Sequence, residues 1–253
     1  MITQKNASGV GMSFNGLQIG KRDSQLWIEI DRAEKANAMT VAMMEAMTSA
    51  IVDAAADGRT QAIVLTAKGE KLFCAGVDVR ERSPDGDAAR QRERRSHALA
   101  ALQDSVMTTP VPVVVALNGL AVGAGAMLAL MADGCVAVEG AALSLPEIDI
   151  GIATFSGANI LMVLGGRALA ADLVQTGRRL SVADALDRGL ISAVVARPAL
   201  EHAATTIAET LGSKNRAAFA DNKHWINRGL RSALKEAREE HARHRGKLQA
   251  AGK

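Results

Sequence analysis

The chain has 253 residues, of which 48% are hydrophobic and 23% charged, a composition ordinary for one globular domain or for one domain with a helical appendage. It contains two Trp, four Phe and no Tyr, so the aromatic platforms of single-strand nucleic-acid binders are nearly absent, which argues against a dedicated RNA-binding module; we expect no DNA partner. The formal net charge of +3 is compatible with a polyanionic ligand such as a nucleotide but does not require one.

The cysteine count and the apolar stretches bear on the compartment. Two cysteines, Cys74 and Cys135, are too few for a disulfide scaffold, which favours a reducing environment. The first residues lack a basic stretch followed by an apolar run, so no signal peptide is predicted. The longest apolar stretch, 121–132, holds two glycines and is too short to span a bilayer. We therefore expect a cytoplasmic protein with no membrane partner.

Apolar periodicity and turn residues divide the chain into predicted elements. Residues 1–15 are polar, and we expect them to be irregular. Strands are predicted, in chain order, at 17–21, 26–30, 62–66, 111–117, 136–138, 143–145 and 190–195. Helices are predicted at 41–56, 123–131, 160–164, 169–175 and 182–188, and the chain after Pro198 is predicted to be wholly helical.

This alternation of strands and helices indicates an α/β fold. We expect two parts, a core at residues 1–198 and a C-terminal helical segment at 199–253. The helical segment mixes apolar positions with many charges, so we expect it to bury its apolar stripe against the core or against a neighbouring subunit.

A first motif follows the strand predicted at 62–66. It is Gly69-Glu-Lys-Leu-Phe-Cys-Ala-Gly-Val-Asp78, and it contains the pair Ala75-Gly76. Glycine permits a backbone conformation that a Cβ would forbid, so the N–H of the next residue, Val77, can point into a cavity. An ordinary glycine turn between a strand and a helix is the commoner explanation of such a pair taken alone.

A second motif, Asn118-Gly-Leu-Ala-Val-Gly-Ala-Gly-Ala-Met127, follows the strand predicted at 111–117. Its small residues admit a ligand or another backbone, and the helix that begins here offers unpaired N–H groups to an oxygen that gains negative charge. A dinucleotide fingerprint would need glycine where Leu128 stands, and a P-loop would need a lysine that this motif lacks. A small-residue helix in a tightly packed core remains the alternative.

A third motif, Leu145-Pro-Glu-Ile-Asp-Ile-Gly151, places Glu147 in an otherwise apolar stretch. A solvated surface position is the default for a single carboxylate. Here the neighbours suggest partial burial, which would raise the pKa of Glu147 toward that of a useful general base.

The order and spacing of these motifs resemble the crotonase (enoyl-CoA hydratase/isomerase) superfamily. The resemblance extends to Asp31-Arg-Ala-Glu-Lys-Ala-Asn-Ala-Met39, to Asp133 and to the segment from Thr176 to Val195, and it covers roughly residues 17–197. It implies a crotonase-like spiral of ββα units, with a C-terminal helical oligomerisation segment that builds a homotrimer or hexamer. It also implies an acyl-CoA thioester as the substrate, with CoA part of that substrate, no separate cofactor and no metal.

The resemblance also assigns roles to single residues. It places an oxyanion hole for the thioester at the backbone N–H groups of Val77 and Ala124, and a donor of this kind is typically worth about 3–4 kcal/mol. It gives proton transfer to Glu147. The substrate-binding residues that it implies are Ala75, whose backbone would meet the adenine, together with Gly76, Asp78, Gly123, Lys35 and Arg32. Lys35 and Arg32 are candidates for the CoA phosphates, although a solvated cation is the commoner role of either.

The chain departs from the hydratases of this family at one of their two glutamates. Glu147 holds the place of the second, but Met127 holds the place of the first and can neither position water nor move a proton. Phe155 stands in a segment where hydratases have a glycine-rich turn, and we expect it to exclude water. A single glutamate in a dry pocket is the arrangement of Δ3,Δ2-enoyl-CoA isomerases, which is the activity that the resemblance favours.

Other interpretations stay open. Enoyl-CoA hydratase is the first alternative, and a catalytically quiet acyl-CoA-binding or RNA-binding scaffold on the same fold is the second. Asp149 is a candidate second acid and His97 a candidate for the acyl pocket, but a structural role is the commoner one for each. We expect the charged run at 80–95 to form a mobile lid over the acyl chain.

Overall fold

Two sheets contain the strands of the chain, and the computed structural model describes residues 2–6, 9–83 and 85–250. The larger sheet has the strand order β1-β2-β3-β4-β5-β7-β9-β12, and the smaller one has the order β11-β10-β8-β6. The strands are β1 (Ile2–Asn6), β2 (Gly9–Phe14), β3 (Leu17–Arg22), β4 (Gln25–Ile30), β5 (Ala62–Ala67), β6 (Leu72–Cys74), β7 (Val113–Leu117), β8 (Leu120–Val122), β9 (Gly134–Val138), β10 (Ala142–Ser144), β11 (Arg179–Ser181) and β12 (Ala193–Val195).

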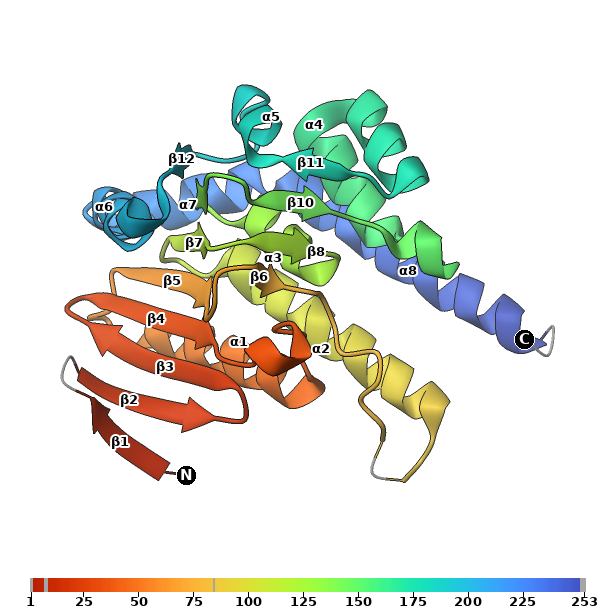
Figure 1. Ribbon diagram of the computed structural model, residues 1–253, viewed down its shortest axis with the longest axis horizontal. Coiled ribbons are helices and arrows are strands. Elements are labelled where there is room, and N and C mark those ends of the chain that lie inside the picture. The colour runs from red at the N-terminus through yellow and green to blue at the C-terminus, as the bar shows by residue number, and fades with distance from the viewer. Residues whose placement is uncertain (1, 7–8, 84, 251–253) are drawn as a thin grey trace.

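Helices cover the sheets and extend beyond them. They are α1 (Val41–Ala56), α2 (Ala88–Thr108), α3 (Ala124–Met131), α4 (Phe155–Thr176), α5 (Val182–Asp187), α6 (Leu200–Gly212), α7 (Arg216–Ile226) and α8 (Arg228–Ala250), with short 3-10 turns η1 (Ala33–Lys35), η2 (Glu147–Ile150) and η3 (Arg197–Ala199). Figure 1 shows α2 and α8 projecting from the strands toward the same end of the molecule.

The middle of the chain repeats one unit of a long strand, a short strand and a helix. The units are β5-β6-α2, β7-β8-α3 and β9-β10-α4. Strands β5, β7 and β9 are parallel neighbours in the larger sheet, while β6, β8 and β10 are neighbours in the smaller one. The chain therefore spirals, which confirms the predicted arrangement of ββα units.

The core of this spiral is almost free of aromatic side chains, as the composition predicts. Methionines of α1 and of the segment before it fill much of the space beneath the larger sheet: Met39, Met43, Met44 and Met47 are each at most 1% exposed. Met is unbranched and adapts to irregular gaps, so it can take the place that Phe or Tyr commonly fills.

The N-terminal segment differs from the prediction. Strands β1 and β2 extend the larger sheet as antiparallel neighbours beside β3, where irregular chain is expected. Asn15 and Gly16 both have positive φ, 38° and 89°, in the two-residue turn between β2 and β3. An Asn-Gly pair is a strong hairpin signal, so this pairing was available from the sequence.

Two other predicted elements end elsewhere. The strand predicted at 190–195 is confined to β12, because the Leu190 N–H donates to the Ala185 carbonyl and so closes the turn after α5. The two helical segments predicted at 160–164 and 169–175 both belong to α4, whose backbone is non-helical at Gly166 (φ 80°, ψ 168°). By length and composition alone α4 could cross a membrane; a single such helix is weak evidence, and a third of its apolar window is buried in this fold.

The C-terminal helices attach to their own chain. Helix α6 contacts β5, β7 and β9, and α8 lies along α4. In α7 the buried Lys223 ammonium lies 2.5 Å from a carboxylate oxygen of Asp133, the residue just before β9. Of the predicted apolar stripe, Leu230 and Leu234 are buried, whereas Trp225 and Ile226 are 65% and 73% exposed.

Candidate active site

The turn after β6 holds its backbone in a conformation that favours glycine. Gly76 has φ +93°, and its N–H donates to the Cys74 sulfur at 3.3 Å. On one side the turn is fixed to the segment before α1, because the Met39 N–H donates to the Gly76 carbonyl and the Asp78 N–H donates to the Met39 carbonyl, both at 2.8 Å. These two hydrogen bonds form a parallel β-bridge between Met39 and Val77, so the N–H of Val77 points away from Met39. On the side away from Met39, Val77 lines a cavity.

Asn37 fixes the chain on the other side of β6, before this turn. It is 1% exposed and has a positive φ of 54°. Its side-chain amide donates to the carbonyls of Lys68 and Leu72, at 3.0 and 2.9 Å, and its side-chain carbonyl accepts the Arg32 N–H. Asn37 therefore fixes the two ends of the loop between β5 and β6, and the neighbouring Ala36 carbonyl accepts the Ala75 N–H at 3.1 Å, at the start of the turn that carries Val77. An asparagine between two alanines could have indicated a buried polar side chain that bonds the backbone, but sequence reasoning did not single it out.

The second loop meets the first at close range. Gly123 precedes α3 with φ +54°, and the N–H of Ala124, the first residue of the helix, has no acceptor among the described residues. A Cβ at Gly76 would lie 3.2 Å from the Val122 carbonyl oxygen and 3.5 Å from the Ala124 nitrogen. The backbones that carry Val77 and Ala124 are thus side by side.

Glu147 lies next to this pair of loops. A Cβ at Gly123 would lie 3.2 Å from Oε1 of Glu147. The turn η2 holds the glutamate, since the Ile152 N–H donates to the Glu147 carbonyl at 2.9 Å. Oε2 is buried and has no hydrogen-bond partner among the residues that the structure describes. Burial raises the pKa of Glu147, and its own backbone and the Thr154 hydroxyl offset only part of that rise.

These groups open on one cavity of about 670 Å³. Of the predicted site residues, Ala75, Gly76, Val77, Gly123, Ala124 and Glu147 all line it. Asp149 and His97 line it as well, and both side chains are exposed. An adjoining hollow of about 1040 Å³ shares Val77 and Leu99 with it and contains Arg90 and Arg92 from the first turns of α2. Half of the predicted lid is therefore helix.

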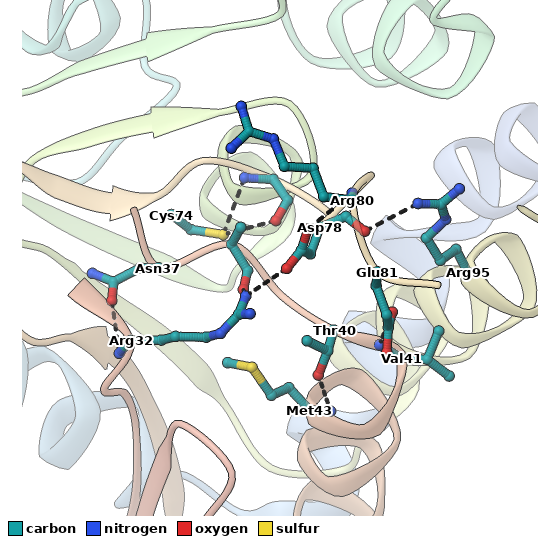
Figure 2. A network of polar contacts seen from close by, with 12 residues as sticks. Arg32, Asn37, Thr40, Val41, Met43, Cys74, Asp78, Arg80, Glu81 and Arg95 are labelled. Atoms are coloured by element: carbon teal, nitrogen blue, oxygen red, sulfur yellow. Dashed lines mark hydrogen bonds and ion pairs between the residues drawn. The ribbon is translucent and has the colours of Figure 1, made fainter. Parts of the chain in front are cut away.

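Arg32, Asp78 and Lys35 lie outside both hollows. The Arg32 guanidinium donates to Asp78 Oδ2 at 2.8 Å and to the Ala38 carbonyl at 2.9 Å, while Arg95 donates to the Asp78 carbonyl from α2. Figure 2 shows the two arginines approaching the loop from different sides. These contacts favour a supporting role for Arg32 and Asp78 over the predicted contact with substrate. Lys35 is exposed, and its role stays a prediction.

At the position where the resemblance predicts a second glutamate in hydratases, the cavity wall holds a thioether and an amide. Met127 is 5% exposed and lines the cavity, and its sulfur accepts the Gln103 Nε2 amide at 3.5 Å. The Gln103 carbonyl oxygen accepts Arg238 of α8 at 3.2 Å. Sequence reasoning missed Gln103 and Arg238, because nothing in a helical pattern shows which polar residue of α2 or α8 will face a cavity.

Phe155 does not take the predicted position. Thr154 and Ser156 line the cavity, whereas the Phe155 ring meets the rings of His241 and His244 edge-on, at centroid distances of 4.8 and 5.8 Å. At the start of α4 the ring turns toward α8, so it joins two helices. The prediction that Phe155 keeps water from the reacting atoms therefore loses its structural basis.

Comparison with known proteins fits this geometry. The family model for enoyl-CoA hydratase/isomerase matches residues 21–252. A Rhizobium meliloti (strain 1021) protein named "Probable enoyl-CoA hydratase" is 33% identical over 230 residues, which are 89% of this chain and 86% of that protein. The chain belongs to the enoyl-CoA hydratase/isomerase family. It is therefore an acyl-CoA enzyme of the crotonase superfamily.

A curated relative and a solved structure are also similar to this chain. Carnitinyl-CoA dehydratase of Salmonella enteritidis PT4 is 34% identical over 200 residues, covering 77% of this chain and 74% of that protein. The crystal structure of enoyl-CoA hydratase from Bacillus anthracis superposes with a TM-score of 0.78 at 30% identity, covering 89% and 90% of the two chains. Among the described residues, no group of three or more His, Cys, Asp or Glu could hold a metal ion.

Proposed function

We propose that the enzyme is a Δ3,Δ2-enoyl-CoA isomerase in which Glu147 is the only proton carrier. One observation supports this most directly: Glu147 brings a buried, unpaired carboxylate oxygen to the cavity, and Met127 occupies the place of a second glutamate. A thioether has no proton to give and cannot activate water, and Asp149 and His97 line the cavity but are exposed, so these observations support proton transfer by Glu147 alone.

In this mechanism the backbone holds the charge and Glu147 moves the proton. The thioester oxygen accepts the N–H groups of Val77 and Ala124, whose backbones lie together. Glu147 removes a proton from C2, and the resulting enolate oxygen gains the negative charge that these donors stabilise. The same carboxyl returns the proton at C4, which leaves the double bond between C2 and C3. The backbone of Ala75 and the Lys35 ammonium are proposed contacts for CoA.

Enoyl-CoA hydratase is the second candidate, and two observations favour it. Relatives of similar identity carry the names of a hydratase and a dehydratase. In addition, the Phe155 ring lies against α8 and leaves the cavity open to water on that account. A hydratase with one carboxylate would have to use Glu147 both to activate water and to protonate C2.

The two activities are separated by assaying the wild type on paired substrates. We expect a 3-enoyl thioester to be converted to the conjugated 2-enoyl thioester faster than crotonyl-CoA is hydrated. Efficient hydration of crotonyl-CoA without 3-enoyl isomerisation would replace the first candidate by the second. Tight binding of CoA thioesters with no turnover, and no exchange of the C2 proton in heavy water, would leave only a binding scaffold.

We also expect the enzyme to form a trimer or hexamer. Trp225 and Ile226 at the end of α7 are exposed, as are Met162 and Val163 on α4, and an exposed apolar group of this kind is typical of subunit contacts. Light scattering at micromolar concentration measures the mass, and a monomeric mass would contradict the expectation.

A further inference from the structure

The wall of the cavity between α2 and α8 contains polar groups that an apolar acyl chain would not use. Gln103 of α2 is 2% exposed, and Arg238 of α8 reaches the same cavity. Neither residue takes part in the proposed proton transfer. Both residues have N–H donors that their hydrogen bonds within the described residues do not satisfy well.

Gln103 has an amide donor that is poorly satisfied. Its Nε2 carries two N–H bonds, and its one acceptor among the described residues is the Met127 sulfur at 3.5 Å. A thioether is a weak acceptor, so this contact replaces little of the hydrogen bonding lost on burial. The other end of the amide is fixed, because its oxygen accepts Arg238 at 3.2 Å. The nitrogen therefore stays beside Met127.

Arg238 is held in place and has a spare donor as well. Its two terminal nitrogens donate to the two carboxylate oxygens of Asp104, at 2.8 and 2.9 Å, and one of them also donates to the Ala100 carbonyl. Its Nε is buried and has no partner in the described part of the chain. Buried donors without acceptors are costly, so the pair is better satisfied when a bound molecule brings an oxygen.

We infer that the acyl group of the substrate carries a neutral oxygen, a hydroxyl or a carbonyl, which accepts a hydrogen bond from the Gln103 amide in the wall held by Arg238. This inference rests on the proposed function in one respect, namely that the cavity binds an acyl-CoA thioester. Gln103 is then a specificity-determining residue. A carboxylate is disfavoured, because Asp104 already balances the charge of Arg238 and would repel a second anion.

Calorimetry on unreactive thioesters tests the inference without depending on turnover. Octanoyl-CoA is compared with oxo-octanoyl-CoA thioesters that carry the keto group at successive carbons beyond C3. We expect one keto position to bind at least about tenfold more tightly than octanoyl-CoA, since a site built to donate a hydrogen bond discriminates against an analogue that lacks the acceptor. A dicarboxylic analogue of equal length forms the third arm.

Two substitutions isolate the amide donor. Gln103→Met keeps the volume and removes both N–H bonds, while Gln103→Glu keeps an oxygen for Arg238 and removes the N–H bonds. We expect both to abolish the preference, so that in each variant the keto thioester and octanoyl-CoA bind with affinities within about twofold of each other. Arg243→Met is the matched control on α8, because Arg243 is exposed and pairs with Glu240. It should retain the preference.

The outcomes distinguish this inference from the proposed function. A wild type that binds octanoyl-CoA as tightly as every keto analogue would overturn the inference and leave the isomerase proposal standing. If the dicarboxylic analogue bound most tightly, the inference that the acyl oxygen is neutral would be wrong. If Gln103→Met and Gln103→Glu both kept the preference for a keto thioester, Gln103 would not be the hydrogen-bond donor to the acyl oxygen. Failure to bind any thioester would overturn both proposals.

Discussion

The cavity has a backbone side and a side-chain side, and they are built differently. On the backbone side, the loops at Gly76 and Gly123 come so close that a Cβ on Gly125 would lie 2.7 Å from the Cys74 side chain. On the side-chain side, Gln103, Met127 and Arg238 reach the cavity from α2, α3 and α8, which are distant in the sequence.

This difference separates two tasks. In the proposed mechanism the backbone side offers N–H groups to the thioester oxygen, which every acyl-CoA substrate carries, and its close packing leaves little room for substitution. On the side-chain side the groups that face the cavity are side chains of helices, so we expect one residue there to be exchanged for another without moving a loop. We therefore expect binding of the thioester to depend on the backbone side, and the choice of acyl group and reaction to depend on the side-chain side.

Removing the charge of Glu147 should have the largest effect on turnover. Glu147→Gln is nearly isosteric and keeps the fold, but the amide cannot take a proton. Turnover should fall by about 10²- to 10⁴-fold, the range for a lost general base. Steady-state rates on a 3-enoyl thioester measure the loss, and calorimetry should show thioester binding within a few-fold of wild type. Retained turnover would transfer the role of base to another group, with Asp149 the first to test.

A substitution at Gly76 breaks the backbone side. Gly76→Val places a branched side chain at φ +93° and against the Val122 carbonyl, so it should displace the Val77 N–H. We expect kcat to fall by about 10²- to 10³-fold, the cost of a lost oxyanion donor, and thioester binding to weaken as well.

The control for this variant is Gly58→Val. Gly58 has φ +68° with open space around its Cβ position, and it lies outside the candidate site, so it reproduces the backbone strain alone. It should lose stability in urea denaturation but keep kcat. A folded Gly76→Val enzyme with wild-type kinetics would remove this loop from the site.

The contrast also explains what the sequence could predict. The site at Val77, Ala124 and Glu147 was predicted from the order and spacing of three motifs taken together, which resemble one family, since each motif alone has a commoner structural explanation. The β2–β3 hairpin was predictable from Asn15-Gly16 but was missed. The Gln103 and Arg238 contacts were not predictable, because they depend on how α2 and α8 pack against each other across more than a hundred residues.

A second carboxylate at position 127 tests whether the side-chain side of the cavity selects the reaction. Met127→Glu puts an acid beside the Gln103 amide, which can donate to it, and near the reacting atoms. We expect hydration of crotonyl-CoA to rise by about tenfold, below the 10²- to 10⁴-fold typical of a well-positioned acid or base, because the new carboxylate is not held in an evolved position. Met127→Gln, of the same size but without an ionisable group, should produce no gain. An equal gain in both variants would mean that polarity, and not proton transfer, had been limiting.

The pH dependence should give the smallest effect, and it tests whether the burial of Glu147 matters. Burial raises the pKa of this carboxyl, and only the ionised form can remove a proton. Isomerase kcat/KM should therefore be at its maximum above the raised pKa and fall as the pH decreases through it, with a midpoint above the ordinary glutamate value of about 4.3.

The same burial of Glu147 disfavours the charged form of its carboxyl in the folded state. The free energy of unfolding contributed by Glu147 should thus be highest below the ordinary value and should decrease as the pH rises through the raised one, by about 1.4 kcal/mol per pKa unit. Glu147→Gln removes this loss, so urea denaturation should find the variant more stable than wild type at neutral pH. Because the variant otherwise shares every titrating group, an identical pH dependence of stability in both proteins would show that Glu147 is hydrated in the free enzyme.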